Sequence, residues 1–254
     1  MVMRRRALRK ARGRRRLMLL CGTAAMVALI GLYYTVRASP IFDVHAVTVS
    51  GGNTKLNATV QSAAEQAAQG KSLLAFDTGA LHSELQAMPW VRAVTVDRDF
   101  PNTLSVDLVL YKPAVAVTAG DHTYLVAGDG HVIATTAKPS PHLVSVVLPA
   151  DSKLAVGTTS NDRQLGSALW LLHSTPAWFR HQFGAITAIE PRQGTLNATM
   201  GAKMQLRLGA PSQLDLKMRV VERTLGKLSA HDRRGIRYID VSAPNRPAVL
   251  NFRN

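Results

Sequence analysis

The chain has 254 residues, enough for one or two ordinary domains with a buried core. Its formal net charge is +15 at pH 7, but nine of the 31 Lys and Arg residues lie within residues 1–16, and the first acidic residue is Asp43. Beyond the tail, the chain has 22 Lys and Arg residues and 16 Asp and Glu residues. This balance is typical of an ordinary protein surface and argues against a nucleic-acid-binding groove. Cys21 is the one cysteine, so no intrachain disulfide can stabilise the fold.

Residues 17–36 are predicted to form a single transmembrane helix. They contain no charge and no proline, and a helix of this length rises about 30 Å, the thickness of a bilayer's hydrocarbon core. A cleaved signal peptide is the competing interpretation, but its apolar region is usually about 7–15 residues long and ends at a small-residue cleavage site. Residues 36–38 make a poor cleavage site, so an uncleaved anchor is favoured.

The basic tail over residues 1–16 predicts the orientation of this helix. Basic residues next to a membrane helix stay on the cytoplasmic side, which places the N-terminus inside and residues 37–254 outside. The residues that set this topology are Arg4, Arg5, Arg6, Arg9, Lys10, Arg12, Arg14, Arg15 and Arg16.

Beyond the membrane segment, the first folded region has the element order β-α-α-β-β. Strands rich in β-branched and alternating apolar residues are predicted over 42–49, 91–96 and 103–110, with a turn over 99–102 joining the last two. This order favours a small sheet with two helices on one face.

Two helices are predicted between the first and second of these strands. Asn57 can cap a helix that ends at Gly70, and Asp77 can cap another that stops before Pro89. The apolar faces follow helical spacing: Val60, Ala64 and Ala67 in the first helix, and Leu81, Leu85 and Met88 in the second.

After Pro113 the pattern is richer in strands. A hairpin with a Gly-Asp-Gly turn is predicted over 124–133, and helices are predicted over 161–173, capped by Asn161, and over 212–228, beginning with a cap. Further short strands are predicted at 143–148, 185–189, 204–208, 237–241 and 248–252.

Two stretches of this sequence are similar to a known family. Pro89-Trp90-Val91 and the run from Arg98 to Leu104 resemble the POTRA domain of the FtsQ/DivIB family of bacterial cell-division proteins, and residues 205–250 resemble that family's second, β-rich domain. The resemblance implies an α+β protein. Its parts are a cytoplasmic tail (1–16), a transmembrane helix (17–36), a POTRA domain (37–112) and a β-rich mixed domain (113–254).

The sequence contains no recognisable enzyme signature. Gly70-Lys71-Ser72 is similar to the end of a phosphate-binding loop, but Glu65 stands where that motif requires glycine. HExxH, GxSxG and paired-cysteine spacings do not occur. His173 and His181 flank Trp178 without a nearby acidic third ligand, which favours a helix end over a metal site. We therefore expect no catalytic residue, cofactor, metal or small-molecule substrate.

By resemblance, the function is that of a division scaffold at the septum, in the inner (plasma) membrane. Such a protein links cytoplasmic and extracytoplasmic division proteins and helps recruit or control septal peptidoglycan synthesis by protein–protein binding. The partners that the resemblance implies are FtsB, itself paired with FtsL, and through them the septal peptidoglycan synthase.

The resemblance also places partner binding in the C-terminal strand region, over residues 243–251. Pro244 and Pro247 cannot donate to a strand ladder, and prolines at a sheet edge also guard against unwanted pairing. The residues expected to bind the partner are Ala243, Asn245, Arg246, Ala248, Val249, Leu250 and Asn251.

Two other functions remain open at the level of sequence. A POTRA-bearing component of a transport or secretion system would more naturally show repeated POTRA units or a following barrel, and the sequence shows neither. A membrane-anchored extracytoplasmic enzyme would need convergent polar side chains in a pocket.

Overall fold

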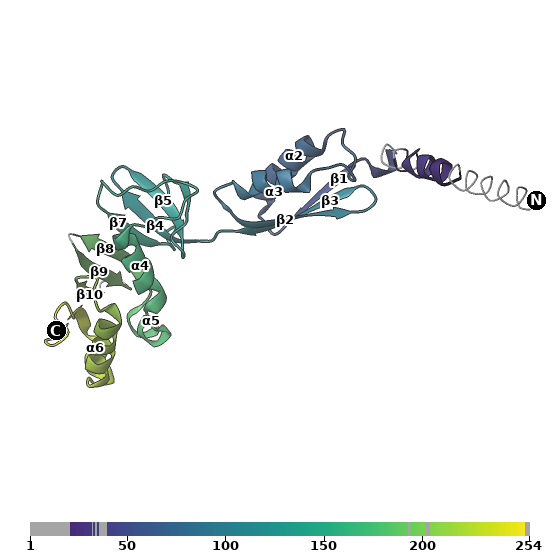
Figure 1. Cartoon of the computed structure of the whole chain (residues 1–254). Helices are drawn as coiled ribbons and strands as arrows, with labels where there is room; N and C mark the ends of the chain where they lie inside the picture. The colour runs from purple at the N-terminus through teal and green to yellow at the C-terminus, as the bar shows by residue number, and fades with distance from the viewer. Residues whose placement is uncertain are drawn as a thin grey trace, which may run out of the picture. The chain divides into compact units, whose positions relative to one another are not determined.

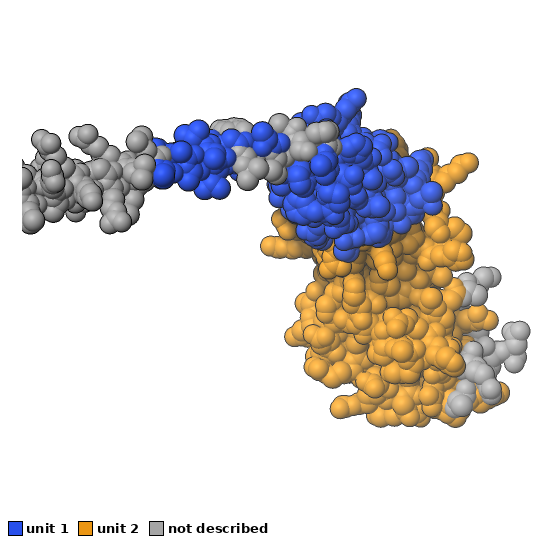
Figure 2. Space-filling model, turned by 90° about the vertical axis from the view of Figure 1, so that its right-hand side faces the viewer, with its two compact units in different colours: residues 1–86, 93–109 blue, residues 87–92, 110–254 orange. Residues whose placement is uncertain are grey.

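The structure is a computed structural model that describes residues 21–31, 33, 35, 40–192, 194–201 and 204–251. The chain divides into two compact units, which Figure 2 shows in different colours. Unit 1 comprises residues 1–86 and 93–109, and unit 2 comprises residues 87–92 and 110–254.

The predicted transmembrane helix lies only partly within the described residues. Residues 21–31, 33 and 35 are helical, whereas residues 17–20 and the basic tail over 1–16 lie outside the described part. Among the described residues, no helix combines the length and the apolar character that a membrane crossing requires. The membrane helix and its orientation therefore stay predictions.

Unit 1 contains a three-stranded sheet in the order β1-β3-β2, with two helices on one face (Figure 1). β1 runs parallel to β3, with Val47 opposite Leu104. Buried apolar residues from strands and helices form the core, among them Val60, Leu81 and Leu85. The elements are a 3₁₀ turn η1 (Pro40–Phe42), β1 (Ala46–Ser50), α2 (Thr54–Ala68), α3 (Thr78–Gln86), β2 (Val91–Asp99) and β3 (Thr103–Leu110).

The N-terminal ends of β1 and α2 differ from the prediction. β1 begins at Ala46 because residues 40–42 form the 3₁₀ turn and the Val44 N–H donates to the Lys71 carbonyl at 3.2 Å. α2 begins one turn early because Asn53 Oδ1 accepts the Leu56 N–H at 2.9 Å, so the prediction that Asn57 is the cap was wrong.

The second helix of unit 1 agrees with its prediction at the N-terminal end. Asp77 Oδ1 accepts the Ala80 N–H at 3.0 Å, and Leu81 and Leu85 are buried as their spacing predicts. The helix ends at Gln86, three residues before Pro89, which leaves Met88 outside the helix and half-buried.

Unit 2 is built on a nine-stranded mixed sheet in the order β12-β11-β10-β9-β8-β7-β4-β5-β6. Figure 1 labels its strands β4, β5, β7, β8, β9 and β10. The pairs β4/β7, β7/β8 and β10/β11 are parallel, and the other pairs are antiparallel. The strands are β4 (Pro113–Ala119), β5 (His122–Ala127), β6 (Val132–Thr135), β7 (Val144–Leu148), β8 (Ile186–Arg192), β9 (Thr195–Met200), β10 (Met204–Gly209), β11 (Ile236–Asp240) and β12 (Ala248–Asn251).

In the described part of unit 2, four helices accompany this sheet, and three of them (α4, α5 and α6) share one hydrophobic cluster with the strands. Leu165 and Leu171 from α4, and Val221 and Leu225 from α6, are buried together with the apolar residues of the strands. On β10, Leu206 and Leu208 enter this cluster while Gln205 and Arg207 are exposed, so at this strand one sheet face is apolar and the other is polar. The helices are α4 (Arg163–Ser174), α5 (Ala177–Phe183), α6 (Leu214–Gly226) and α7 (Ala230–Arg234).

In unit 2 the N-terminal caps of two helices differ from the prediction. Asp162, not Asn161, caps α4, because its Oδ1 accepts the N–H groups of Gln164 at 2.7 Å and Leu165 at 3.1 Å. α6 begins at Leu214. The residue before it, Gln213, has a φ of 54° and makes no side-chain cap hydrogen bond, so the cap predicted for this helix is not found. The short elements β4, α5 and β9 were not predicted.

Candidate functional site

β12 forms one edge of the nine-stranded sheet. It pairs antiparallel with β11, with Ala248 opposite Asp240, Val249 opposite Ile239 and Leu250 opposite Tyr238. In the part of the chain that the structure describes, no strand pairs with its outer side. An edge strand with unpaired N–H and C=O groups can accept a further strand from another chain.

The side chains of β12 alternate between two environments. Val249 is half-buried against the hydrophobic cluster, whereas Ala248 and Leu250 are exposed, Leu250 to 50%. An added strand would therefore meet backbone groups along the edge, the apolar Val249 on one face and the apolar Leu250 on the other.

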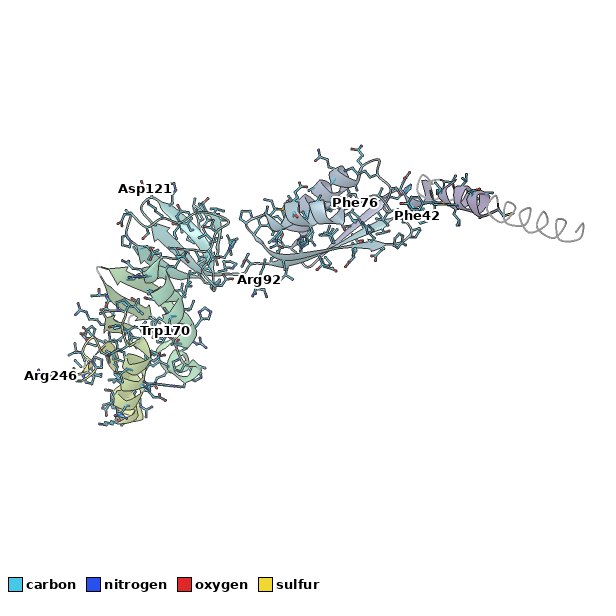
Figure 3. All side chains as sticks on the ribbon, in the orientation of Figure 1. Phe42, Phe76, Arg92, Asp121, Trp170 and Arg246 are labelled. Carbon is cyan, nitrogen blue, oxygen red and sulfur yellow. The ribbon has the colours of Figure 1, made fainter. Side chains whose placement is uncertain are left out.

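The structure separates the predicted binding residues into a strand and a loop. Residues 248–251 form β12, while Ala243, Asn245 and Arg246 lie in the loop before it, where the Arg246 N–H donates to the Ala243 carbonyl at 2.9 Å. Figure 3 labels Arg246, whose side chain is exposed. Pro244 and Pro247 also lie in the loop, so neither proline interrupts the ladder of β12.

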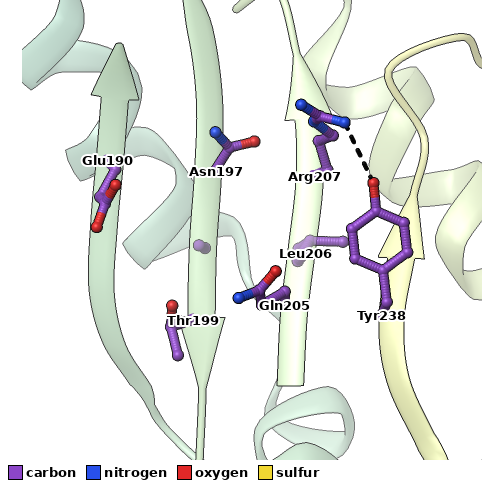
Figure 4. A pocket seen from close by; sticks show the side chains of 8 residues that line it. Glu190, Asn197, Thr199, Gln205, Leu206, Arg207 and Tyr238 are labelled. Atoms are coloured by element: carbon purple, nitrogen blue, oxygen red, sulfur yellow. Dashed lines mark hydrogen bonds between the residues drawn. The ribbon is translucent and has the colours of Figure 1, made fainter. Parts of the chain in front are cut away.

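A polar cluster at the end of β11 lies beside this edge. The Asp240 carboxylate accepts hydrogen bonds at both oxygens: Oδ1 from the Ser242 N–H at 2.8 Å and hydroxyl at 2.5 Å, and Oδ2 from the Tyr238 hydroxyl at 2.8 Å. Arg207 Nη1 lies 3.8 Å from Asp240 Oδ2 and donates to the Tyr238 hydroxyl oxygen at 3.4 Å, the bond drawn in Figure 4.

These contacts favour the ionised form of Asp240. Its partial burial acts to raise the pKa, but the hydrogen bonds from Ser242 and Tyr238 and the charge of Arg207 outweigh that effect, so the pKa lies below its usual value. The hydrogen bond with Tyr238, with a smaller contribution from the charge of Asp240, raises the pKa of Arg207. The Arg207 side chain is 56% exposed, so water screens this ion pair and the hydrogen bonds dominate the cluster.

The polar sheet face also carries a shallow hollow of about 310 Å³, shown in Figure 4. It crosses β8 to β11, with Arg207 opposite Asn197 and Gln205 opposite both Thr199 and Tyr238. No His or Cys lines it, and among the described residues no group of three metal-ligating side chains is placed to hold a metal ion. The lining residues are Glu190, Asn197, Ala198, Thr199, Gln205, Leu206, Arg207 and Tyr238.

Sequence reasoning identified the strand but missed the cluster that adjoins it. Asp240 followed two residues later by Ser242 is a turn signal, because an Asp side chain can accept the N–H of the second residue after it. The contribution of Arg207 had no local signal, since it depends on the parallel pairing of β10 with β11.

Comparisons with known proteins agree with this architecture. Residues 42–109 match the family described as "POTRA domain, FtsQ-type", and residues 114–242, about half of the chain, match "Cell division protein FtsQ/DivIB, C-terminal". The POTRA match coincides with the β-α-α-β-β elements of the described structure. The loop and strand over 243–251 lie beyond the second match.

Several relatives bear the name "Cell division protein FtsQ". The protein of Corynebacterium glutamicum is 27% identical over 114 residues, which cover 45% of this chain and 50% of that protein. Those of Myxococcus fulvus and Rickettsia bellii are 31% and 27% identical over 83 and 81 residues, about a third of this chain. The matches span half or less of the length of these relatives. With both family matches in the order found here, the chain belongs to the FtsQ/DivIB family of cell division proteins.

Proposed function

We propose that this protein is a non-catalytic scaffold of the division complex, held in the inner (plasma) membrane by its N-terminal helix and concentrated at the septum. Outside the cytoplasm it binds other division proteins and helps recruit or control septal peptidoglycan synthesis. Its direct partner is a protein of the FtsB type, paired with one of the FtsL type, and through them it acts on the septal peptidoglycan synthase. Family membership supports this proposal.

The observation that supports partner binding at β12 is that this strand forms an open edge of the sheet. A partner segment in extended conformation gains backbone hydrogen bonds along the edge and apolar contacts with Val249 and Leu250. The two prolines lie in the preceding loop, so β12 retains its N–H donors. Neither a transport component nor an enzyme gains a comparable observation from the described residues.

A substitution at the edge tests this proposal without removing the strand. Leu250→Arg places a charge where an added strand would bring an apolar side chain, while the exposed position tolerates arginine in the free protein. Thr135→Arg is the matched control, because Thr135 is an exposed residue of β6 at the opposite edge of the same sheet.

The measurement is capture of FtsB- and FtsL-type proteins from membranes by the full chain carrying either substitution, compared with a chain that ends at Ala243. We expect Leu250→Arg to reduce capture about tenfold or more, Thr135→Arg to leave it unchanged, and the truncated chain to lose it. Full capture by the truncated chain, with circular dichroism showing that it is folded, would refute docking at β12.

A further inference from the structure

We propose that Asp240 is a positioning residue for the docking edge: it fixes Ser242 and thereby the loop over 241–247 that brings β12 onto β11. The effect of this positioning on partner binding at β12 rests on the proposed function. The positioning itself follows from contacts within unit 2.

Asp240 lies next to both ends of the loop over 241–247. It is the last residue of β11, and in the β11–β12 ladder it lies opposite Ala248, the first residue of β12. Its Oδ1 accepts both the N–H and the hydroxyl of Ser242, at 2.8 and 2.5 Å, which fixes the first turn after the strand. One carboxylate therefore sets the direction in which the chain leaves β11.

The second oxygen of the same carboxylate connects this turn to the face of the edge. Oδ2 accepts the Tyr238 hydroxyl at 2.8 Å, and Tyr238 is the residue opposite Leu250 in the ladder. Hydrogen bonds to an ionised acceptor are roughly twice as strong as neutral ones. Asp240 therefore connects the turn at Ser242 to Tyr238, which lies opposite Leu250.

Ser242 is also confined from the side of β10. Gly209 has a φ of 65°, and a Cβ built on it would lie 2.6 Å from Ser242 Cβ and 2.9 Å from Ser242 Cα. Only a glycine allows the Ser242 backbone to approach this closely. In addition, the Val241 N–H donates to the Arg207 carbonyl at 2.9 Å. The start of the loop is thus packed against β10 while Asp240 holds it from β11.

β12 makes few contacts of its own, so the contacts of Asp240 matter for its position. β12 has four residues, and in the described part of the chain it pairs with one neighbouring strand and packs Val249 against the hydrophobic cluster. Short edge strands of this kind open locally at low free-energy cost. A partner that adds to β12 binds more weakly if it must first order the strand, so contacts that order the free edge raise affinity.

Hydrogen exchange in the full chain without partner tests the positioning directly. We expect Asp240→Ala to speed amide exchange over residues 241–251 about tenfold or more relative to the unsubstituted protein. Asp240→Asn keeps an oxygen acceptor for Ser242 but loses the charge and the acceptor for Tyr238, so it is expected to restore part of the protection. Ser242→Ala removes only the hydroxyl donor and gives a smaller change in the same segment.

Asp129→Ala is the matched control for these variants. Asp129 Oδ1 accepts the His131 N–H at 3.1 Å, so this Asp makes the same kind of contact in the turn between β5 and β6. Its loss is expected to speed exchange there and to leave residues 241–251 unchanged. Wild-type exchange over 241–251 in a folded Asp240→Ala protein would overturn the proposal.

Capture of the FtsB-type protein by the same variants separates the two proposals. Faster exchange at the edge together with weaker capture in Asp240→Ala, both partly restored in Asp240→Asn, supports both proposals. Faster exchange with unchanged capture keeps the positioning role and counts against docking at β12. Weaker capture with unchanged exchange overturns positioning by Asp240.

Discussion

Lys217 is a buried cation on α6, with only 3% of its surface exposed. Its Nζ donates to the Ala210 carbonyl at 2.5 Å, in the loop between β10 and α6. Desolvation lowers the pKa of this ammonium group below its usual 10.5, because burial penalises the charged form. The sequence offered no sign of this burial, since a lysine in an amphipathic helix with several other bases is normally assigned to the solvent face.

The lowered pKa of Lys217 predicts how stability depends on pH. Between the folded-state pKa and about 10.5, the unfolded chain binds the proton and the folded chain does not, so the free energy of unfolding gains a term that rises with pH. Below the folded-state pKa, the full penalty of burying the charge is present. Lys217→Met keeps the apolar stem and removes the titrating group.

Urea unfolding of the wild-type protein and of Lys217→Met at a series of pH values from about 7 to about 10.5 measures this effect. Relative to Lys217→Met, the wild-type protein is expected to gain stability as the pH approaches about 10.5. Lys227→Met, at the exposed end of α6, is the comparison for the loss of a lysine charge from this helix. A stability difference between wild type and Lys217→Met that stays constant over this whole pH range would contradict the lowered pKa.

At the scale of the helix and strand, alternating apolar residues were the reliable signal. Leu104, Val106 and Leu108 are buried along β3, as their period of two predicts. Helix starts were less predictable, because Asn53 and Asn57 have the same capping chemistry and sit one turn apart. The bond from Asn53 to the Leu56 N–H decides between them, and it adds a turn that the apolar spacing alone did not require.

The contrast between these two asparagines can be measured. Asn53→Ala removes the cap of α2 and is expected to lower the stability of unit 1 by about 1 kcal/mol. Asn57→Ala is expected to cost less or to stabilise, because Asn57 Oδ1 is buried without a hydrogen-bond partner and alanine is the better helix former. Thermal unfolding of the two variants checks the order, and a larger loss for Asn57→Ala would contradict it.

The proposed docking strand was predictable where it depends on local sequence. The strand over 248–251 follows from its apolar residues, and it was predicted to within a residue. The positioning contacts to Tyr238, Arg207 and Gly209 come from β10 and β11, and the parallel β10/β11 pairing aligns segments about thirty residues apart. A single sequence carries no local signal for such a pairing, so the contacts of Asp240 emerged only with the fold.

At the scale of the whole molecule, the proposed function requires that both folded units lie outside the cytoplasm. A strand edge that binds extracytoplasmic division proteins is useful only on that side of the membrane, and the nine basic residues of the tail are the sequence feature that predicts this orientation. The apolar segment over 17–36 is predicted to supply the anchor, and a cleaved signal peptide is the alternative that the sequence leaves open.

Topology is tested with the full chain in spheroplasts. A tag fused after Asn254 is expected to be accessible to added protease, while a tag before Met1 is protected, and the mass of the mature chain is expected to retain residues 1–36. Replacing the nine bases of the tail by Gln removes the orienting charge and should leave a measurable fraction of chains inverted. A matched variant with nine bases beyond residue 112 replaced by Gln should keep the orientation, because charges far from the membrane helix contribute little. A mature chain that lacks its first 36 residues would establish a cleaved signal and place the protein free of the membrane. In that case the division partners would have to hold it at the septum through β12 alone.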